Sequence, residues 1–435
     1  MHHAQFPQHH PLLARLVALP YEAIANATGF VRRTPRGITP LAFLAALCLE
    51  ATGSAPTLAV CAMRAALVSG QSVSREAFRR RLGAASTTFL QQCLAAAVAL
   101  AAATARRLTP CRFRRILVQD STIIGVPAHL HRVFPGSRNH TQARPALLKI
   151  QAIYDLLSDR FVALRMDSYR RNDQAAAADI LAVAEPCDLI LRDLGYFVLA
   201  IFQRMGARGI DFLSRWRYGT QLFDATSGEP LDLLRVLRRQ GSVDCMVLLG
   251  RETKLPVRLV ALPVAAQVAA ARRRALNCNS DRRCQPSATH RALMNWCIFI
   301  TSVPPERLPA EHIAALYGLR WRIETIFKLW KSCFAIAVIH RRASAAQVRA
   351  FLYARLIALT LMMPLFHGCC EETAGTVTAP QISLLKFTFL FHAVLPFLAC
   401  CAHVHLPHIM SALASHARYD KRRRPHHLAK RAVLS

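Results

Sequence analysis

The spacing of apolar and polar residues divides the chain into helical ends and a middle part with strands. Residues 1–105 are rich in Ala and Leu at the three-to-four-residue spacing of helices. Within them, 72–103 predicts two helices with a break near Gly83 and with Ser74 as the N-cap of the first. We therefore expect a helical N-terminal region.

After residue 112, short β-branched runs replace this spacing. The predicted order begins with a strand in 114–122 that ends on Asp120, strand 147–157, strand 161–167 and helix 173–184. A strand in 187–197 that ends on Asp193, a helix opened by Gly195 and strand 209–217 follow. That order is typical of a ribonuclease-H-like fold, in which helices cover a mixed sheet. The sequence thus predicts an α/β catalytic core formed by 106–217 and 301–340.

Residues 218–300 break this rhythm with scattered strand runs and a basic stretch at 270–284, and they predict a β-rich insertion. Helical spacing resumes after Pro309, a residue suited to the start of a helix, and we expect one helix to run through 317–331. A helical C-terminal region at 341–415 and a basic tail at 416–435 complete the predicted organisation.

The chain is strongly basic, with 56 Lys and Arg against 25 Asp and Glu and a formal net charge of +31. A field of this sign attracts polyanions, so nucleic acid is the first expected partner and an anionic membrane surface the second. Four arginines decorate the first helix of 72–103, namely Arg75, Arg79, Arg80 and Arg81. We interpret the N-terminal region as a DNA-binding unit, with a solvated helix as the alternative, and the tail as a source of non-specific affinity.

The mean hydropathy of +0.23 makes membrane association worth considering. Two apolar stretches are candidates: 351–366 is short and contains Arg355, and 384–402 is interrupted by Lys386 and Pro396. Because neither is a clean run of about 20 apolar residues, we expect buried core helices and no membrane span. The N-terminus lacks the layout of a signal peptide, which predicts a cytoplasmic protein.

The 14 Cys are scattered, and none has the CxxC spacing of a zinc site. Cys278 and Cys284 flank a basic loop near His290, and adjacent pairs stand at 369–370 and 400–401. We expect reduced, buried thiols in a reducing compartment.

Three acids are candidates for a metal site. Asp120 and Asp193 end predicted strands, and open α/β sheets place their ligands at such carboxyl ends. Glu324 is the one acid in YGLRWRIETIFKLWK (317–331), which is otherwise crowded with cations. Carboxylates from two strands and a helix suit a pair of divalent ions, although an Asp after a strand also forms turns and caps. Three further aspartates compete for these roles: Asp155, Asp167 and Asp188.

Tyr317, Arg320, Glu324 and Lys331 stand at the spacing Y-x2-R-x3-E-x6-K. This pattern resembles the Y-R-E-K signature of DDE transposases from bacterial insertion sequences, in the insertion sequence four family. The contexts QDST and RDLGYF resemble those of that family's first and second catalytic aspartates, and NWCIFITSVP resembles its approach to the catalytic Glu. The resemblance covers roughly 40–400.

The resemblance implies a catalytic triad of Asp120, Asp193 and Glu324 that binds Mg²⁺, or Mn²⁺ as a substitute, with two ions expected. It also implies that Tyr317, Arg320 and Lys331 grip DNA phosphates beside the cleaved strand. On a single helix these residues and Lys328 would share one face. The residues expected to face the core are Trp321, Ile323, Phe327 and Trp330.

Trp296 stands just before the final helix in an NW-x4-T context. In relatives that close DNA hairpins, a Trp at this place stacks a flipped base, so Trp296 is a further candidate for DNA binding. A core Trp within a strand is the alternative. His140, Lys149 and Arg215 are weaker candidates for DNA contact.

These observations predict a DNA transposase that cleaves element ends to free a 3′-hydroxyl, which then attacks target DNA. Tyr317 is expected to contact phosphate and not to act as a nucleophile. The expected partners are double-stranded terminal repeats, target DNA and a second copy of the chain on paired ends. The alternatives are a catalytically decayed DNA-binding protein derived from a transposase, a nuclease of the same fold, and a membrane-associated helical protein based on 351–402.

Overall fold

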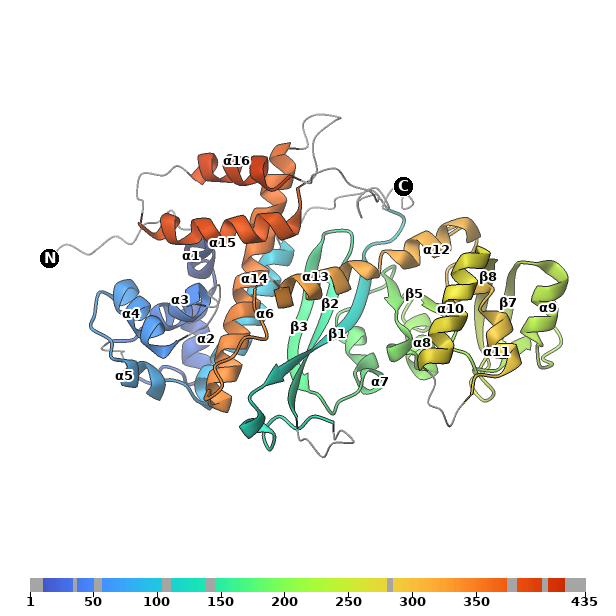
Figure 1. Cartoon of the computed structure of the whole chain (residues 1–435), viewed down its shortest axis with the longest axis horizontal. Coiled ribbons are helices and arrows are strands. Elements are labelled where there is room, and N and C mark those ends of the chain that lie inside the picture. Colours follow the sequence, from blue (N-terminus) through green and yellow to red (C-terminus); the bar gives the residue numbers. More distant parts are fainter. Residues whose placement is uncertain are drawn as a thin grey trace.

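The structure is a computed structural model that describes residues 11–33, 37–50, 57–103, 111–137, 145–279, 285–332, 334–373, 382–400 and 406–418. A long sheet occupies the middle of the molecule (Figure 1). The N-terminal and C-terminal helices lie at one end of this sheet, and the strands and helices of 218–300 lie at the other. Most of the predicted basic tail lies outside the described residues.

The described strands form one nine-stranded sheet in the order β3-β2-β1-β4-β5-β9-β8-β7-β6. The first five are β1 (Ile116–Val126), β2 (Ala146–Asp155), β3 (Arg160–Ser168), β4 (Leu189–Arg192) and β5 (Asp211–Arg215). Strand β2 pairs antiparallel with both β1 and β3, whereas β4 is parallel to both β1 and β5. This mixed sheet with flanking helices confirms the predicted α/β, ribonuclease-H-like class.

Strand β1 is longer than the sequence suggested, because it continues past Asp120 to Val126. The prediction that this strand ends on Asp120 is therefore wrong. Pairing with β2 extends to Val126, but pairing with β4 stops where Val118 meets Leu191. Asp120 consequently lies inside a strand on one side and just beyond the end of the neighbouring strand on the other.

The strands of 218–300 continue the same sheet. They are β6 (Leu222–Asp224), β7 (Val243–Leu249), β8 (Leu255–Pro263) and β9 (Trp296–Thr301), accompanied by α9 (Leu233–Gln240), α10 (Ala266–Asn279) and α11 (Ala288–Leu293). Strand β9 pairs antiparallel with both β5 and β8. It crosses the predicted boundary at residue 300, so the core and the insertion share a strand. The basic stretch that begins at residue 270 starts within α10.

Two hydrophobic cores lie on the two faces of the sheet. Ile116 and Val118 of β1 belong to the first core, whereas Leu117 belongs to the second. The second core is covered by α7 (Asp173–Ala176), α8 (Leu199–Gly206) and the 3₁₀ helix η2 (Ala177–Ala182). This period-two alternation means that consecutive residues of β1 face opposite layers of the protein.

Helices from both ends of the chain build the other layer. They are α1 (Pro11–Val17), α2 (Tyr21–Ala27), α3 (Pro40–Glu50), α4 (Leu58–Ser69), α5 (Arg75–Arg80), α6 (Ala84–Ala103), α14 (Ala345–Thr373), α15 (Leu384–Cys400) and α16 (Leu406–His416). The predicted break near Gly83 separates α5 from α6, and the Ser74 side chain accepts the Ala77 N–H at 3.1 Å as the expected N-cap. Because α14 packs against α1, α3 and α6, the two ends of the chain share one core.

Two described helices, α6 and α14, are long and apolar enough to cross a membrane. In the apolar window of α14, 89% of residues are buried inside the protein, against 44% for α6. Contacts with other helices therefore occupy the apolar surface of α14, as expected for a core helix. The second candidate stretch, 384–402, largely coincides with α15.

Residues 309–331 form two helices, α12 (Ala310–Gly318) and α13 (Trp321–Ser332), joined by a turn at Leu319 and Arg320. The prediction of a single helix through 317–331 is therefore wrong. Trp321 is also misassigned, because it is 56% exposed. At about 100° per residue it lies near Lys328 and away from the buried positions of α13. The other three residues expected in the core are buried: Ile323, Phe327 and Trp330.

Buried charges attach α13 to the sheet. Arg322, only 8% exposed, donates from Nε and Nη2 to Asp159 at 3.1 and 2.8 Å. Asp159 lies in the β2–β3 turn with a left-handed φ of 56°, and it also accepts the Tyr154 hydroxyl. His367 of α14 approaches the same carboxylate at 3.1 Å. One aspartate thus joins β2, α13 and α14.

Replacing Arg322 by Met should destabilise the protein by about 3–5 kcal/mol, because it leaves the Asp159 charge buried without its bidentate partner. Urea unfolding followed by tryptophan fluorescence would measure this. Lys331→Met, an exposed change on the same helix, is the control and should alter the unfolding midpoint little. Adding Asp159→Asn to Arg322→Met should recover part of the loss; a strictly additive double variant would contradict the pairing.

Candidate active site

The parallel register of β1 and β4 sets Asp120 beside Asp193. Val118 pairs with Leu191, and each aspartate lies two residues after its member of this pair. Because side chains two residues apart point to the same face of a sheet, both aspartates point to the face of Val118 and Leu191, which belong to the first core. Both carboxylates therefore face the layer that contains α13, which crosses β1 (Figure 1).

Three carboxylates converge on the Arg320 guanidinium. Its nitrogens lie 2.8 Å from Glu324 Oε1, 3.6 Å from Asp193 Oδ1 and 3.7 Å from Asp120 Oδ2. The Arg320 side chain is 13% exposed. The structure thus brings together the three acids selected from the sequence, and it places between them a cation that was expected to contact DNA. Their assignment as a catalytic triad stays a prediction.

This gathering of charge perturbs the acid–base behaviour of the site. Burial raises the pKa of Asp120 to about 6, and the negative charges of Asp193 and Glu324 push it the same way. The Ser121 N–H and Arg320 oppose that rise. Burial alone would lower the pKa of Arg320, but the surrounding anions, Asp193 first, outweigh it and raise the pKa.

Backbone groups orient the two aspartates. Asp120 Oδ1 accepts the Ser121 N–H at 2.7 Å. Asp193 caps the short 3₁₀ helix η3 (Leu194–Tyr196), and its Oδ2 accepts the Gly195 N–H at 3.3 Å. Each carboxylate keeps its other oxygen directed toward Arg320. The sequence had shown only that both residues follow apolar runs.

A second contact below the aspartates was missed by sequence reasoning. Arg192 Nη1 donates to Gln119 Oε1 at 2.6 Å, and both side chains are 1% exposed. These residues directly precede Asp193 and Asp120, so strand alternation points them to the opposite face. Burial lowers the pKa of Arg192 to about 10. The signal available in the sequence was a polar residue before each aspartate in an otherwise apolar strand.

The donor set fits a hard divalent cation, since carboxylate oxygens are the ligands that Mg²⁺ prefers and they already surround one positive charge. Among the described residues, no group of three or more His, Cys, Asp or Glu is close enough to hold a metal ion as it stands. Arg320 fills the space between the acids. Ion binding therefore requires Arg320 to move and the carboxylates to close in.

The predicted DNA contacts lie at different depths. The Tyr317 hydroxyl donates to the Arg192 carbonyl oxygen at 3.2 Å, and burial raises its pKa to about 12. Lys328 and Lys331 are exposed on α13, and Lys328 Nζ lies 5.2 Å from the centre of the exposed Trp321 ring. The solvent face of α13 beside Glu324 thus presents cations and an aromatic ring.

Trp296 does not join the acid cluster. It begins β9, where it packs at the margin of the second core, and its indole N–H donates to the Gly241 carbonyl oxygen. The ring is half-buried. Both the base-stacking role and the core alternative are compatible with this partly exposed position.

The competing aspartates have structural partners. Asp155 accepts the Leu157 N–H at 3.0 Å in the β2–β3 turn, and Asp167 pairs with Arg171 at 2.7 Å. Asp188 is fully buried against Arg115, which donates to both of its oxygens. These contacts account for the three residues without a metal.

The Cys residues of the described part of the chain differ in burial. The expectation of buried thiols holds only in part, since Cys187, Cys245 and Cys278 are exposed. Cys284, Cys401 and the DNA-contact candidate His140 lie outside the described residues.

A family model described as "Transposase DDE domain" matches residues 112–361, more than half of the chain. The chain belongs to the DDE transposase family. This confirms the family predicted from the Y-R-E-K spacing and the two Asp contexts, and this family generally uses divalent metal ions and acts on DNA.

Named relatives agree with this family. The chain is 30% identical over 271 residues to the transposase for insertion sequence element IS231E of Bacillus thuringiensis subsp. finitimus, an alignment that covers 57% of this chain and 56% of that protein. It is 28% identical over 371 residues to the transposase for IS231C of Bacillus thuringiensis subsp. berliner, covering 78% of this chain and 75% of that protein. A third match, the transposase for IS1151 of Clostridium perfringens, is 26% identical over 277 residues, covering 57% of this chain and 56% of that protein.

The transposase should contain a carboxyl group that titrates near pH 6 in metal-free buffer, because burial holds the pKa of Asp120 at about 6. The group is then mostly protonated at pH 5 and mostly ionised at pH 7. Infrared difference spectra between these pH values would detect it, and Asp120→Asn should remove the signal. Arg320→Gln should move the midpoint upward, since Arg320 opposes the rise; an unchanged midpoint would contradict the geometry.

Proposed function

We propose that this chain is a DNA transposase that cleaves the ends of its element and joins the freed 3′-hydroxyl to target DNA. The observation that supports this most is the convergence of Asp120, Asp193 and Glu324 on one cationic position at the sheet edge. The proposed substrates are double-stranded terminal repeats and target DNA. A dimer on paired ends, acting in the cytoplasm without a membrane, completes the proposal.

Asp120, Asp193 and Glu324 would hold Mg²⁺, with Mn²⁺ as a substitute and two ions as the proposed number. When bound, such ions neutralise charge on the attacking and leaving oxygens of a phosphodiester. The protein contributes the orientation of its carboxylates through Ser121, Gly195 and the bond between Gln119 and Arg192. Rotation of these ligands at the moment of reaction is thereby restricted.

Arg320 would change partners during this process. In the described state its charge offsets the three acids, and bound cations would repel it from that position. The displaced guanidinium remains attached to the turn beside Glu324, where a DNA phosphate can accept two of its N–H groups. Metal ions would then replace the Arg320 guanidinium among the acids, while Arg320 contacts the DNA.

Tyr317 would support this site and not attack DNA. Its raised pKa of about 12 keeps the hydroxyl protonated, and its bond to the Arg192 carbonyl oxygen fixes the ring below Arg320. A phosphate contact by Tyr317 requires that bond to be exchanged. Lys328 and Lys331 are already exposed and would contact the backbone directly, while Trp296 remains a candidate for stacking an unpaired base.

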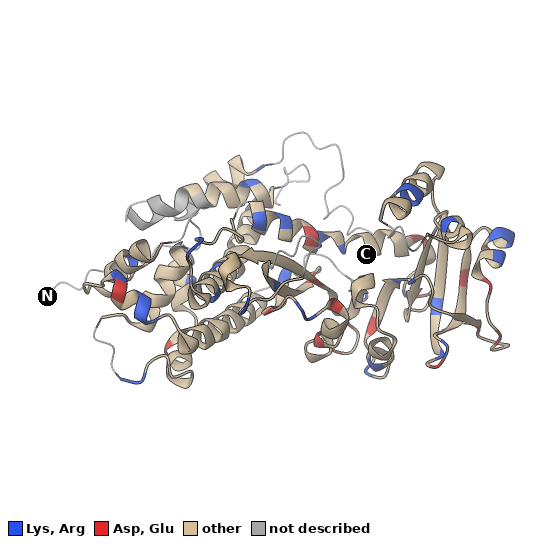
Figure 2. Ribbon diagram, turned by 60° about the horizontal axis from the view of Figure 1, so that its bottom comes forward, with Lys and Arg blue, Asp and Glu red and all other residues tan. Residues whose placement is uncertain are grey.

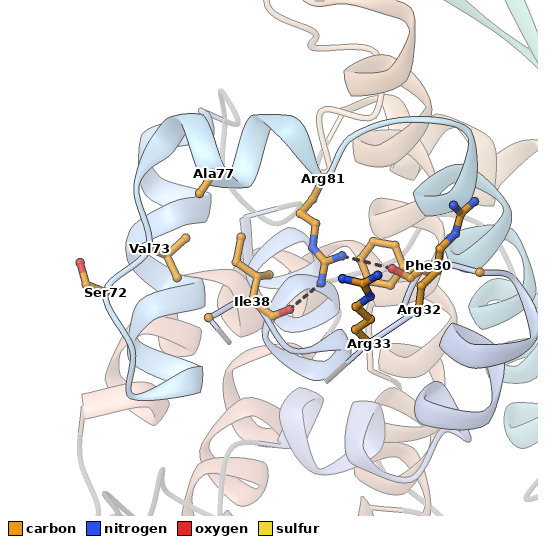
Figure 3. A pocket seen from close by; sticks show the side chains of 10 residues that line it. Phe30, Arg32, Arg33, Ile38, Ser72, Val73, Ala77 and Arg81 are labelled. Carbon is orange, nitrogen blue, oxygen red and sulfur yellow. Dashed lines mark hydrogen bonds between the residues drawn. The ribbon is translucent and has the colours of Figure 1, made fainter. Parts of the chain in front are cut away.

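The N-terminal helices would provide a second DNA contact. A cavity of about 520 Å³ is lined by Arg32, Arg33 and Arg81 together with Phe30 and Ile38 (Figure 3). Arg81 is committed to structure, since it donates to the carbonyl oxygens of Phe30 and Ile38 at 3.2 and 2.9 Å. Arg32 and Arg33 are exposed at its rim, where a phosphate can reach them. Lys and Arg also lie along the whole length of the molecule, so DNA contact need not stop there (Figure 2).

Glu324→Gln should abolish Mg²⁺-dependent nicking of an oligonucleotide that carries the element end, because the charge needed to hold the ion is lost. DNA binding in a gel shift should survive. Glu311→Gln, on the exposed side of neighbouring α12, is the matched control and should nick normally. A Glu324→Gln protein that still nicks would show that the triad is wrongly assigned.

The same assay separates the alternatives. A transposase joins the cut end to a target plasmid, whereas a nuclease of this fold stops after cleavage. A decayed DNA-binding protein shifts the oligonucleotide but does not nick it in Mg²⁺ or Mn²⁺.

The double change Arg32→Ala and Arg33→Ala should weaken binding to end DNA and flatten its salt dependence. Each lost phosphate contact lowers the slope of log affinity against log salt by about 0.9, so we expect a change of about 2. Fluorescence anisotropy at several salt concentrations would measure it. Arg79→Ala is the control with a smaller effect, because Glu76 already pairs with Arg79 at 2.7 Å; equal effects would contradict the cavity as a DNA contact.

A further inference from the structure

Lys149 of β2 is a buried cation close to the proposed active site. Its side chain is 8% exposed, and its Nζ donates to Asp173 Oδ1 at 3.0 Å and to the Arg171 carbonyl oxygen at 3.1 Å. Burying an ammonium group is costly unless it is paired. The contact with Asp173 therefore explains Lys149 better than the DNA contact considered from the sequence.

Asp173 is connected in turn to the strand that carries Asp120. It begins α7, and its Oδ1 also accepts the Ser121 hydroxyl at 3.1 Å. Ser121 is the residue whose N–H orients Asp120. Lys149 and Ser121 thus hold one oxygen of Asp173 in place from two strands.

The other oxygen of Asp173 lies close to Gly195, two residues from Asp193. A Cβ added at Gly195 would lie 3.3 Å from Asp173 Oδ2 and 3.6 Å from Asp193 Oδ2. Gly195 thus lies next to both oxygens, and a side chain at residue 195 would crowd Asp173 Oδ2. Asp173 is 34% exposed, and within the described residues no hydrogen bond to its Oδ2 is formed.

We propose that Asp173 is a positioning residue of the metal centre, an outer carboxylate that accepts hydrogen bonds from the hydration shell of an ion held at Asp193. The inference rests on the proposed function of Asp120, Asp193 and Glu324 as ligands. Mg²⁺ keeps several of its waters when it binds to proteins, and these waters need acceptors. In other metal sites, replacing a residue in this outer position typically weakens metal affinity by about 10- to 100-fold.

The alternative is that Asp173 has only a structural role, in which its charge stabilises the start of α7. That helix has four residues, and a helix this short has a weak dipole. A helix-capping role would not explain why a buried lysine and a serine next to Asp120 both bind one oxygen and leave the other beside Gly195.

The test measures Mn²⁺ binding to the full-length, DNA-free protein by electron paramagnetic resonance of the unbound ion. Asp173→Asn should raise the dissociation constant by about tenfold. Gly195→Ala should also weaken binding, because its methyl group would crowd Asp173 Oδ2 at 3.3 Å and approach Asp193 Oδ2 at 3.6 Å. Asp179→Asn is the matched control: Asp179 follows on the adjoining helix η2 and pairs with Arg165 and Arg171, so affinity should not change.

Asp193→Asn separates this inference from the proposed function. If Asp193→Asn abolishes Mn²⁺ binding while Asp173→Asn leaves it unchanged, Asp173 has no role at the metal centre. If Asp193→Asn itself binds Mn²⁺ normally, the proposed centre is wrong and the inference is wrong with it. A purely structural Asp173 would lower the melting temperature without metal and leave the Mn²⁺ affinity intact, which also overturns the proposal.

Discussion

Three carboxylates cannot lie around one position in a protein unless positive charge accompanies them. Two unit charges 4 Å apart interact by about 4 kcal/mol at the effective dielectric of a protein surface, so the repulsion among three acids is a sizeable fraction of the stability of a domain. Arg320 supplies the missing charge in this structure, with Glu324 as its nearest partner at 2.8 Å. The surrounding strands and helices hold the three carboxylates and the Arg320 guanidinium together.

Arg320 and Arg322, two residues apart in the chain, have different structural roles. Arg320 lies in the break between α12 and α13, where it faces the acids, whereas Arg322 points into the interior and pairs with Asp159. In a continuous helix the directions of the Arg320 and Arg322 side chains would be fixed relative to each other by the helical repeat of about 100° per residue. The break lets α12 support the site through Tyr317 while α13 is attached independently to the β2–β3 turn and to α14. Catalytic geometry and attachment to the core therefore rest on different contacts.

The two faces of the central strands have different chemistry. On the face toward α13, β1 and β4 present Asp120 and Asp193; on the opposite face, the intervening residues form a buried polar layer. That layer contains the Gln119–Arg192 bond and the Tyr196 hydroxyl donating to Gln151. Because buried polar groups must satisfy one another, this layer restricts how far the strands can shift. The position of the two aspartates is thus determined partly by residues that never face the substrate.

The sequence by itself determined the class of sheet and the two-helix pattern around Gly83, because strand and helix periodicity are local properties. It also selected, from short motifs, the three acids that the structure brings together around Arg320. It did not reveal that β1 continues past Asp120, since strand length depends on pairing with β2. It could not distinguish Trp321 from the core residues of α13 without knowing where the helix begins. Only the tertiary structure decided that Arg320 lies among the acids, that Lys149 is buried against Asp173 and that Gln119 meets Arg192. Each of these is a contact between segments far apart in the chain, and its energy depends on burial and distance, which no local pattern contains.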